Sequence, residues 1–394
     1  MSDLSLPAVP PPAPADHRAR DRILATLFAI AIAWPAIAML WSGTRTLTRF
    51  ENRPLAPWPA PALAREFPPA FDRAFSDRFG GRDVYVRFYH GTLLSLFGVS
   101  SLDTVMPGRD GWYYWLGEDG RSLAQHYRGA FPFRQRWIDS TVEELGRRKE
   151  WLAARGIAYV VMVVPEKFTI YPEHLPAWVV RSPLPTPHDR VNAAMRKDGR
   201  VTFIDLREQL RAAKARERVY YQTDSHWNLN GAIVGYEALM REVQRALPEK
   251  LPSVAPVKRP EYTPGVDFYS GDLLQMLAMP SRVREDDVAP LGKVFADVAN
   301  RCARRIDKGE FPGFEYYACD RPGLPRAVVL RDSMAIALVP LLSENFSRVV
   351  YVSTRKFDRA MLDVIEREKP DIVIEELVER TLHAPGAYPM ERRP

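Results

Sequence analysis

From Phe133 to the C-terminus, short apolar runs alternate with amphipathic helical segments, and this alternation limits the fold more than any other feature. A continuous apolar run such as IAYVVMVV (157–164) is typical of a strand buried on both faces. The predicted strands are 157–164, 201–206, 327–330, 348–352 and 371–375. The clearest helices are 133–156, which precedes the first strand, and 231–247, 334–346 and 357–369, which lie between later strands. The pattern predicts an α/β fold with a parallel sheet covered on both faces, interrupted by an irregular, proline-containing insertion at about 251–325.

In a parallel sheet, chemistry lies beyond the carboxyl ends of the strands. The residues that follow the predicted strands are Pro165 to Lys167, Asp205, Arg331 to Ser333, Ser353 to Thr354, and Glu375 to Glu376. Among them only Ser333 offers a nucleophile on a sharp strand-to-helix turn.

The N-terminal part of the chain contains the second constraint on organisation. Residues 23–41 (ILATLFAIAIAWPAIAMLW) run for nineteen positions without a charge, which is about the length of a membrane-spanning helix. Pro35 is tolerated in such a helix. A cleaved signal peptide is the main alternative, because AIA at 36–38 resembles a cleavage site, and a buried soluble helix is the other. We expect an uncleaved anchor; arginines on both sides of the span leave its orientation open.

Residues before and after the span have distinct compositions. The proline-rich residues 1–22 predict a disordered tail, and residues 42–80 a proline-punctuated approach segment. A helical pattern at about 71–97 is followed by PGRDGWYYWLG, which predicts a turn and an aromatic strand. The rings of residues 112–115 could stack on sugars, but we expect them to pack in a hairpin core.

Charge and cysteine content exclude some function classes. The net charge of +6 is spread along the chain without a basic run, so nucleic acid is not the expected partner. Cys302 and Cys319 are the only cysteines. In an oxidising compartment they could form a disulfide, whereas in the cytosol they would be unrelated thiols.

The stretch YYQTDSHWNLNGA contains the strongest candidate for chemistry. Asp224 and His226 are two positions apart in a predicted loop, so their side chains can point the same way and the carboxylate can reach Nδ1 of the imidazole. A serine becomes a nucleophile when such a base takes its proton, and Ser333 stands where the next helix begins. The three residues therefore fit one catalytic triad.

Other interpretations exist for each of these residues. Ser333 or Asp332 could cap the helix that follows, and Asp224 or Ser225 could cap the helix after them. An Asp-x-His pair could also bind a metal, but no third or fourth ligand shows metal spacing in the sequence. We therefore expect neither a metal nor a cofactor.

The whole set of motifs resembles the alginate O-acetyltransferase (AlgX/AlgJ) family of SGNH hydrolase-like proteins. TDSHWNLNGA is similar to the D-x-H-W-x-x-x-G-A signature of that family, and the resemblance extends over about 50–380. Further similar stretches, in the same order, are FENRPLAPWP, FPPAFDRAFSDRFGGRDVYVRFY, MPGRDGWYYW, VVPEKFTIYPEHLP, VVLRDSMAIALVPLLSENFSRVVYV and KPDIVIEELVER.

The resemblance implies an SGNH-hydrolase-like α/β/α fold in which the Asp-x-His pair precedes the serine. By the same resemblance Asp224 orients the base, His226 is the base and Ser333 is the nucleophile. The implied activity is transfer of acetyl groups onto hydroxyls of an alginate-like exopolysaccharide. A membrane O-acyltransferase of the MBOAT class would supply the acetyl group, and other polysaccharide export proteins would be partners.

The resemblance also implies a location and a domain plan. The chain is more similar to the membrane-anchored AlgJ type than to the longer soluble AlgX type, so we expect a single-pass protein of the bacterial inner membrane. The plan is a cytoplasmic tail (1–22), the anchor (23–41), the approach segment (42–80), a periplasmic SGNH-like acetyltransferase domain (81–385) and a short tail (386–394).

The sequence departs from the family pattern in two respects. Arg331 stands where a glycine is usual before Asp-Ser, and no clear counterpart of the separate oxyanion Gly and Asn is found. Lys167 lies in a family-like stretch, where we expect a solvated side chain. A periplasmic esterase or deacetylase, and a non-catalytic polysaccharide-binding subunit, remain the alternative functions.

Overall fold

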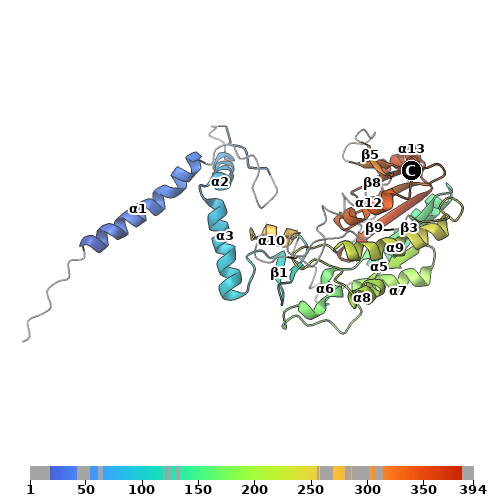
Figure 1. The fold of residues 1–394 in the computed structure, drawn as a ribbon, viewed down its shortest axis with the longest axis horizontal. Helices are drawn as coiled ribbons and strands as arrows, with labels where there is room; N and C mark the ends of the chain where they lie inside the picture. Colours follow the sequence, from blue (N-terminus) through green and yellow to red (C-terminus); the bar gives the residue numbers. More distant parts are fainter. Residues whose placement is uncertain are drawn as a thin grey trace, which may run out of the picture. The chain divides into compact units, whose positions relative to one another are not determined.

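The computed structural model describes residues 18–41, 54–60, 65–118, 120–121, 126–129, 134–254, 257, 269–279, 285, 302–306 and 314–383. The chain divides into two compact units, Met1–Tyr89 and His90–Pro394. Figure 1 shows the order of the elements in both. Residues 1–17 of the predicted N-terminal tail, and the whole predicted tail 386–394, lie outside the described residues.

The first unit contains the apolar helix. Helix α1 (Arg18–Trp41) includes the predicted span, and its stretch Arg18–Met39 has a mean hydropathy of 1.9. Among the described residues it is the one helix long and apolar enough to cross a membrane. The predicted helical pattern at 71–97 is split into two helices, α2 (Phe67–Arg78) and α3 (Arg82–Thr92). Gly81 lies between them, and its φ of 77° is not a helical conformation. Helix α3 continues into a π-helical turn, η1 (Leu93–Phe97).

In the second unit, η1 is followed by a short hairpin. Strands β1 (Val105–Pro107) and β2 (Tyr113–Trp115) pair antiparallel. The aromatic residues Trp112, Tyr113 and Tyr114 are at most 4% exposed, so they form core as expected and offer no stacking surface for a sugar.

A seven-stranded sheet forms the centre of the second unit, in the order β4-β3-β9-β7-β8-β6-β5. The first five strands run parallel, and all five were predicted. Their bounds are β3 (Ala158–Val164), β4 (Thr202–Asp205), β7 (Arg326–Leu330), β8 (Arg348–Val352) and β9 (Ile372–Val378). The antiparallel edge strands β5 (Arg304–Ile306) and β6 (Glu315–Ala318) lie in the insertion, where no strand was predicted.

The helices of the second unit are α5 (Gln135–Ala153), α6 (Lys167–Ile170), α7 (Pro187–Asp198), α8 (Arg207–Lys214), α9 (Leu229–Ala246), α10 (Asp272–Met276), α12 (Val339–Ser343) and α13 (Arg359–Glu368). The described residues of this unit also form the 3₁₀ segments η2 (Pro172–His174), η3 (Ser333–Leu338) and η4 (Glu379–His383). The single helix predicted at 334–346 is therefore a 3₁₀ segment followed by one short α-helix.

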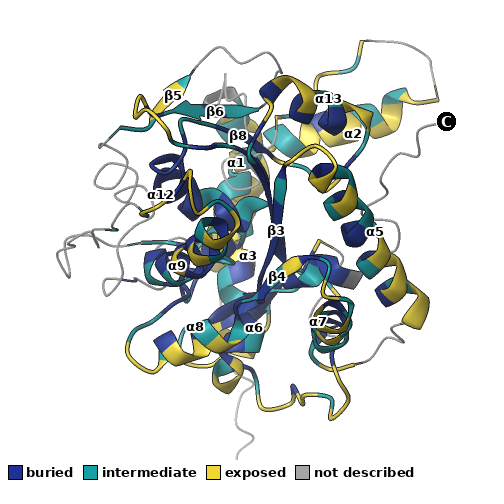
Figure 2. Cartoon of the chain, turned by 90° about the vertical axis from the view of Figure 1, so that its right-hand side faces the viewer, coloured by how far each residue is buried: buried dark blue, intermediate teal, exposed yellow. Residues whose placement is uncertain are grey.

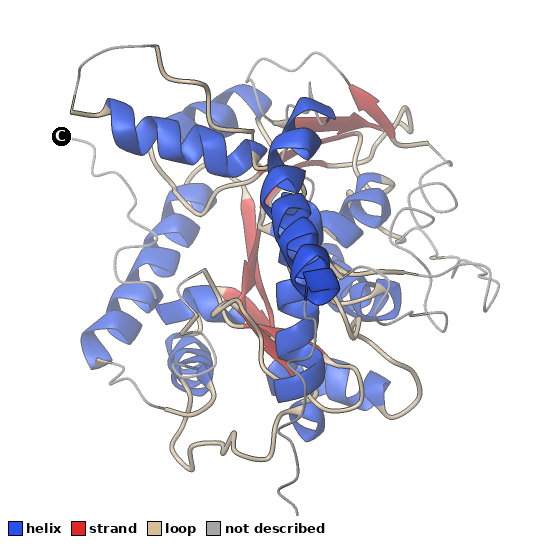
Figure 3. Cartoon of the chain, turned by 90° about the vertical axis from the view of Figure 1, so that its left-hand side faces the viewer, coloured by secondary structure: helices blue, strands red, loops and turns tan. Residues whose placement is uncertain are grey.

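Two hydrophobic cores lie on the two faces of the sheet. On β3, Val160 and Met162 point to one face and Val161 and Val163 to the other, as the period of two requires. Helices α8, α9 and α12 cover the first face, and α5, α7 and α13 cover the second. Figures 2 and 3 show the sheet between these two layers. The second unit thus has the predicted α/β/α architecture.

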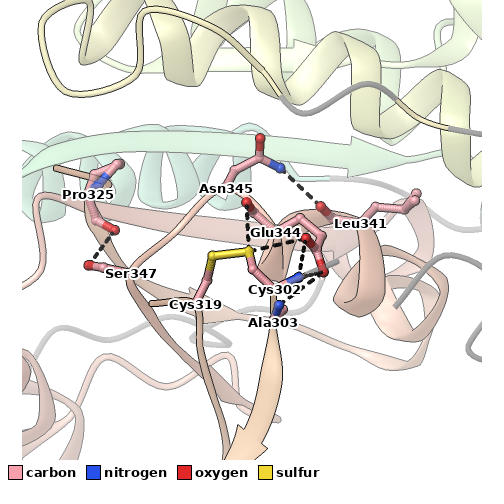
Figure 4. The surroundings of a disulfide bond; sticks show 8 residues. All are labelled: Cys302, Ala303, Cys319, Pro325, Leu341, Glu344, Asn345 and Ser347. Atoms are coloured by element: carbon pink, nitrogen blue, oxygen red, sulfur yellow. Dashed lines mark hydrogen bonds between the residues drawn. A yellow bond between two sulfur atoms is a disulfide. The ribbon is translucent and has the colours of Figure 1, made fainter. Parts of the chain in front are cut away.

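A disulfide connects the two ends of the edge hairpin. Cys302, just before β5, is bonded to Cys319, just after β6, with 4.9 Å between their Cα atoms. Figure 4 shows that the Glu344 carboxylate accepts hydrogen bonds from the backbone N–H groups of Cys302 and Ala303. The disulfide joins the ends of β5 and β6, and the Glu344 hydrogen bonds hold the start of β5 to the segment that follows α12. A disulfide is expected if the body of the protein is in an oxidising compartment.

We predict that the double substitution Cys302→Ser/Cys319→Ser destabilises the second unit by about 3 kcal/mol, because the bond closes a loop of 17 positions in the unfolded chain. Chemical denaturation of the full chain in detergent, followed by far-UV circular dichroism, measures the effect. Reduced wild type should match the variant. Equal midpoints for oxidised wild type and the variant would contradict the prediction.

Candidate active site

The Asp-x-His loop adopts the geometry expected from its spacing. The Asp224 carboxylate oxygen Oδ1 lies 2.6 Å from Nδ1 of His226 and also accepts the His226 backbone N–H at 2.9 Å. The Asp224 side chain is buried, whereas the His226 side chain is 24% exposed. A buried carboxylate thus orients an imidazole whose other nitrogen, Nε2, is available to a partner.

Neither Asp224 nor Ser225 caps the helix that follows this loop. Asn228 is the N-cap of α9, and its side chain accepts the Gly231 N–H at 3.1 Å. The alternative in which Asp224 or Ser225 caps this helix is therefore wrong. Gly231 is required sterically, because a Cβ there would lie 2.3 Å from the Val219 carbonyl oxygen. The small residues that open α9 thus allow the chain to approach the loop closely.

Ser333 stands at the carboxyl end of β7, as predicted. It is the first residue of η3, and Asp332 is the N-cap, accepting the Met334 N–H at 2.8 Å. The capping role proposed for Asp332 or Ser333 thus falls to Asp332. The Ser333 side chain is half-buried and has no hydrogen-bond partner within the described part of the chain.

One buried hydrogen bond connects the loop of His226 to the segment of Ser333. The indole N–H of Trp227 donates to the Met334 carbonyl at 2.8 Å, and the Trp227 ring is fully buried. The neighbours of His226 and Ser333 in sequence are therefore in direct contact, although 107 positions separate them. The structure brings Asp224 and His226 into direct contact, and it brings Ser333 to the same region without a hydrogen bond to His226 among the described residues.

The insertion supplies residues to the site that the sequence analysis missed. The Tyr269 hydroxyl donates to Oδ2 of Asp224 at 2.5 Å, and the Asp272 N–H donates to the same oxygen at 3.0 Å. Asp272 in turn accepts from the Ser225 N–H and hydroxyl at 2.8 and 2.6 Å. Glu285 accepts the backbone N–H groups of Gln222 and Thr223 at 2.7 Å each. No sequence signal marked these three, because they lie in an irregular segment without periodicity.

Lys167 is buried, so the prediction of a solvated side chain is wrong. It is 2% exposed, and its ammonium group donates to the carbonyls of Tyr221, Gln222 and Asp224 at 3.0, 3.0 and 2.6 Å. Lys167 follows β3, and its hydrogen bonds hold the backbone of the Asp-x-His loop against the end of that strand. Three carbonyl acceptors around its ammonium group explain why a lysine is buried there.

Electrostatic interactions set the charge of the pair. Burial favours a raised pKa for Asp224, but the hydrogen bonds from His226, Tyr269 and the Asp272 backbone outweigh it, so the pKa is lowered and the group stays ionised. Burial acts to lower the pKa of His226, but the hydrogen bond and charge of Asp224 prevail and raise it. Both shifts stabilise an imidazolium at His226.

Asp224, His226 and Asp272 offer three ligand atoms within 4.8 Å of one another, so the structure supplies the third metal ligand that the sequence did not show. These atoms already bond to one another or to neighbouring donors. Oδ1 of Asp224 binds His226, Oδ2 accepts two hydrogen bonds, and the Asp272 carboxylate accepts two from Ser225. The candidate ligand atoms of Asp224, His226 and Asp272 thus already take part in a hydrogen-bond network.

Arg331, the departure before Asp-Ser, has a partner in the insertion. Its guanidinium pairs with Glu315 of β6 and donates to the Asp332 carbonyl at 3.2 Å. A larger side chain is therefore accommodated at this turn because an edge strand provides a carboxylate for it.

Comparison with known proteins agrees with the resemblance drawn from the motifs. Residues 105–296 match the family model described as "SGNH hydrolase-like domain, acetyltransferase AlgX". This stretch of the chain is therefore similar to the AlgX type of SGNH hydrolase-like domain. Asp224 and His226 lie within the matched part of the AlgX-type domain, and Ser333 lies beyond it.

Curated relatives and solved structures carry related names. The chain is 27% identical over 190 residues to "Probable alginate O-acetylase AlgJ" of Pseudomonas aeruginosa (46% of this chain, 42% of the relative), and 30% identical over 176 residues to the protein of the same name from Pseudomonas syringae (44% and 41%). The matches thus span about two fifths of these relatives. The "O-Acetyltransferase Domain of Pseudomonas putida AlgJ" overlaps 71% of this chain and 91% of its own, with 20% identity and a TM-score of 0.45.

We predict that Lys167 makes stability rise with pH in the alkaline range. Burial lowers its pKa from 10.5 to about 8, so between these values the unfolded chain binds more protons than the folded one. From pH 7.5 to 9.5 the free energy of unfolding of wild type should therefore rise by about 2 kcal/mol relative to Lys167→Met. Denaturation at both pH values measures the difference.

The exposed Lys197 provides the control for this measurement. Lys197→Met should show the same pH dependence as wild type, since its lysine is not buried. A constant gap between wild type and Lys167→Met across the range would show that the buried ammonium does not titrate there.

Proposed function

We propose that this protein is an O-acetyltransferase that moves acetyl groups onto hydroxyls of an exopolysaccharide through Ser333, His226 and Asp224. The observation that carries the proposal is the 2.6 Å contact between Asp224 and His226, in a loop whose Trp227 binds the segment that begins with Ser333. The names of the relatives, which refer to alginate and to O-acetylation, support the reaction class and the kind of acceptor.

The reaction proceeds in two half-steps. In the first, Oγ of Ser333 attacks the acetyl carbonyl of a donor while Nε2 of His226 takes the hydroxyl proton. The tetrahedral intermediate then expels the leaving group, which receives that proton, and an acetyl-serine remains. The ionised Asp224 stabilises the imidazolium that exists between these events, in agreement with the raised pKa of His226.

In the second half-step a sugar hydroxyl attacks the acetyl-serine and passes its proton to His226. Collapse of the intermediate transfers the acetyl group to the sugar and returns the proton to Oγ of Ser333. Water in place of the sugar would make the same residues an esterase, so the acceptor alone separates the two activities.

The resemblance to the AlgJ type supplies the partners of this proposal. A membrane O-acyltransferase of the MBOAT class would deliver the acetyl group to the periplasmic side, and the acceptor would be a polysaccharide handled by the other export proteins. The proposal needs no cofactor, because proton transfer and nucleophilic attack are both supplied by side chains.

We predict that Ser333→Ala and His226→Ala each lower acetyl transfer by about 10³-fold or more, because the nucleophile and base act as one unit, and that Asp224→Ala lowers it by a similar amount or somewhat less. The full chain in detergent is supplied with a chromogenic acetyl ester, with and without an oligosaccharide acceptor. Chromophore release reports the first half-step, and mass spectrometry of the oligosaccharide reports the second.

Ser353→Ala is the matched control, since this exposed serine also follows a strand of the sheet. It should retain full activity. Near-normal transfer by Ser333→Ala would overturn the assignment. Ester cleavage without acetylation of the acceptor would identify an esterase. The absence of any turnover by wild type would favour a non-catalytic polysaccharide-binding subunit.

We further predict that α1 anchors the protein in the bacterial inner membrane with the second unit in the periplasm. The length and hydropathy of α1 and the disulfide between Cys302 and Cys319 support this arrangement. A reporter fused to the C-terminus that is active only in the periplasm should be active, and the chain should stay in the membrane fraction. Activity of a cytoplasm-only reporter would contradict the topology, and a soluble mature form would contradict the anchor.

A further inference from the structure

The second unit contains a cavity of about 490 Å³ that none of the three proposed catalytic residues lines. It is bounded by α6, α8 and η4, which follow β3, β4 and β9, so it opens at the carboxyl edge of the sheet. Its wall includes Tyr127, Ile170, Arg181, Arg211, Lys214 and Glu379.

Not all the charged groups of the wall are available to a ligand. Arg207, a further cation of the wall, forms ion pairs with Asp205 and Asp189 at 2.7 and 2.5 Å, and Lys214 pairs with Glu173 at 2.6 Å. Glu379 is buried, and one of its oxygens accepts the Glu166 N–H and the Thr169 hydroxyl. These groups are balanced within the protein.

Two guanidinium groups retain N–H donors for which no described residue is an acceptor. Arg211 donates one hydrogen bond of 3.3 Å to the Thr169 carbonyl and forms no ion pair within the described part of the chain. The nearest carboxylate contact of Arg181 is to Asp189 at 3.9 Å, and Asp189 is already bound to Arg207. A guanidinium with unused N–H groups is suited to bind a carboxylate.

The rest of the wall has the character of a sugar site. Tyr127 contributes a half-buried aromatic ring, and the exposed Pro172 contributes apolar surface. Sugar rings present apolar C–H faces that pack on such surfaces, while their substituents face polar groups. A cavity that joins an aromatic ring to two guanidinium groups therefore fits a carboxylated sugar better than a small inorganic anion.

A short segment links the cavity to the proposed catalytic residues. Glu379 lines the cavity, and the next residue, Arg380, binds the Glu166 carboxylate at 2.6 Å. Glu166 precedes Lys167, which holds the Asp224 carbonyl. The cavity and the Asp-x-His loop thus share supports at one edge of the sheet, where a long polymer could reach both.

We propose that this cavity is a subsite that binds a carboxylated sugar unit of the polysaccharide through Arg181 and Arg211, at a distance from the unit that is acetylated. The identity of the ligand as a polymer segment rests on the proposed function, whereas the carboxylate chemistry rests on the wall of the cavity. Such a subsite selects acidic polymers and retains the chain between successive transfers.

Calorimetric titration of the full chain in detergent with a tetrasaccharide of uronic acid tests the proposal without an acetyl donor. We expect binding to wild type, and a dissociation constant raised about tenfold or more in Arg181→Gln/Arg211→Gln, because a charge-assisted hydrogen bond to a carboxylate contributes about this factor. Arg216→Gln, which changes an exposed arginine outside the cavity wall, is the matched control and should bind as wild type does.

Two other probes identify the chemistry of the ligand. The carboxyl-reduced, neutral tetrasaccharide should bind wild type about as weakly as the uronate binds the double variant. Inorganic phosphate should bind more weakly than the uronate. Equal affinity for the reduced sugar, or tighter binding of phosphate, would overturn the proposal. The single variant Arg211→Gln, which breaks one backbone contact only, covers the case in which the double variant does not fold.

Failure of this inference and failure of the proposed function give different results. Binding of the uronate should persist in Ser333→Ala, because that residue does not line the cavity. Uronate binding without any acetyl transfer would support the subsite and contradict the proposed acetyltransferase activity. Acetyl transfer with no uronate binding, or with binding unaffected by the double variant, would support the acetyltransferase activity and contradict the subsite.

Discussion

The hydrogen bond from the Trp227 indole to the Met334 carbonyl is the contact on which the arrangement of the site depends. The loop of His226 is attached to α9, and Ser333 is attached to β7, so neither element alone determines the distance between base and nucleophile. The indole is fully buried, and its N–H would lose a partner if the two segments separated. A buried donor without an acceptor costs about 1–3 kcal/mol, which is enough to keep the two segments together.

A buried lysine and several carboxylates make the Asp-x-His loop rigid. Lys167 binds three carbonyls of this loop from the end of β3, and Glu285 binds two of its N–H groups. Tyr269 and the backbone of Asp272 complete the hydrogen bonds of the Asp224 carboxylate. An irregular loop can be buried only when its polar groups are paired, and here the pairing comes from two parts of the chain, the segment after β3 and the insertion. The insertion is therefore part of the site rather than a surface extension of the fold.

The sequence predicted those parts of the fold and site that depend on local pattern. Short, mostly apolar runs between helical segments identified all five parallel strands, and the two-residue spacing identified the contact between Asp224 and His226. The edge strands β5 and β6 were missed because they are short and half-exposed, so they show neither a continuous apolar run nor a regular alternation. Lys167 was predicted to be solvated because its burial depends on carbonyls that are more than fifty positions away. Asp272 and Tyr269 were missed for the same reason: a long-range contact leaves no periodic signal.

The turn that carries Ser333 divides its tasks between two neighbouring residues. Asp332 caps η3 and, through its other oxygen, accepts the Val378 N–H at 2.9 Å, while its own N–H donates to Glu376 at 3.1 Å. Burial and the nearby charge of Asp332 raise the pKa of Glu376 well above its usual value. The aspartate thus satisfies the backbone at the end of β7 and ties it to β9. Because the cap does not require the serine hydroxyl, Ser333 can present that hydroxyl to a reacting group, and this separates a nucleophile from an ordinary helix cap.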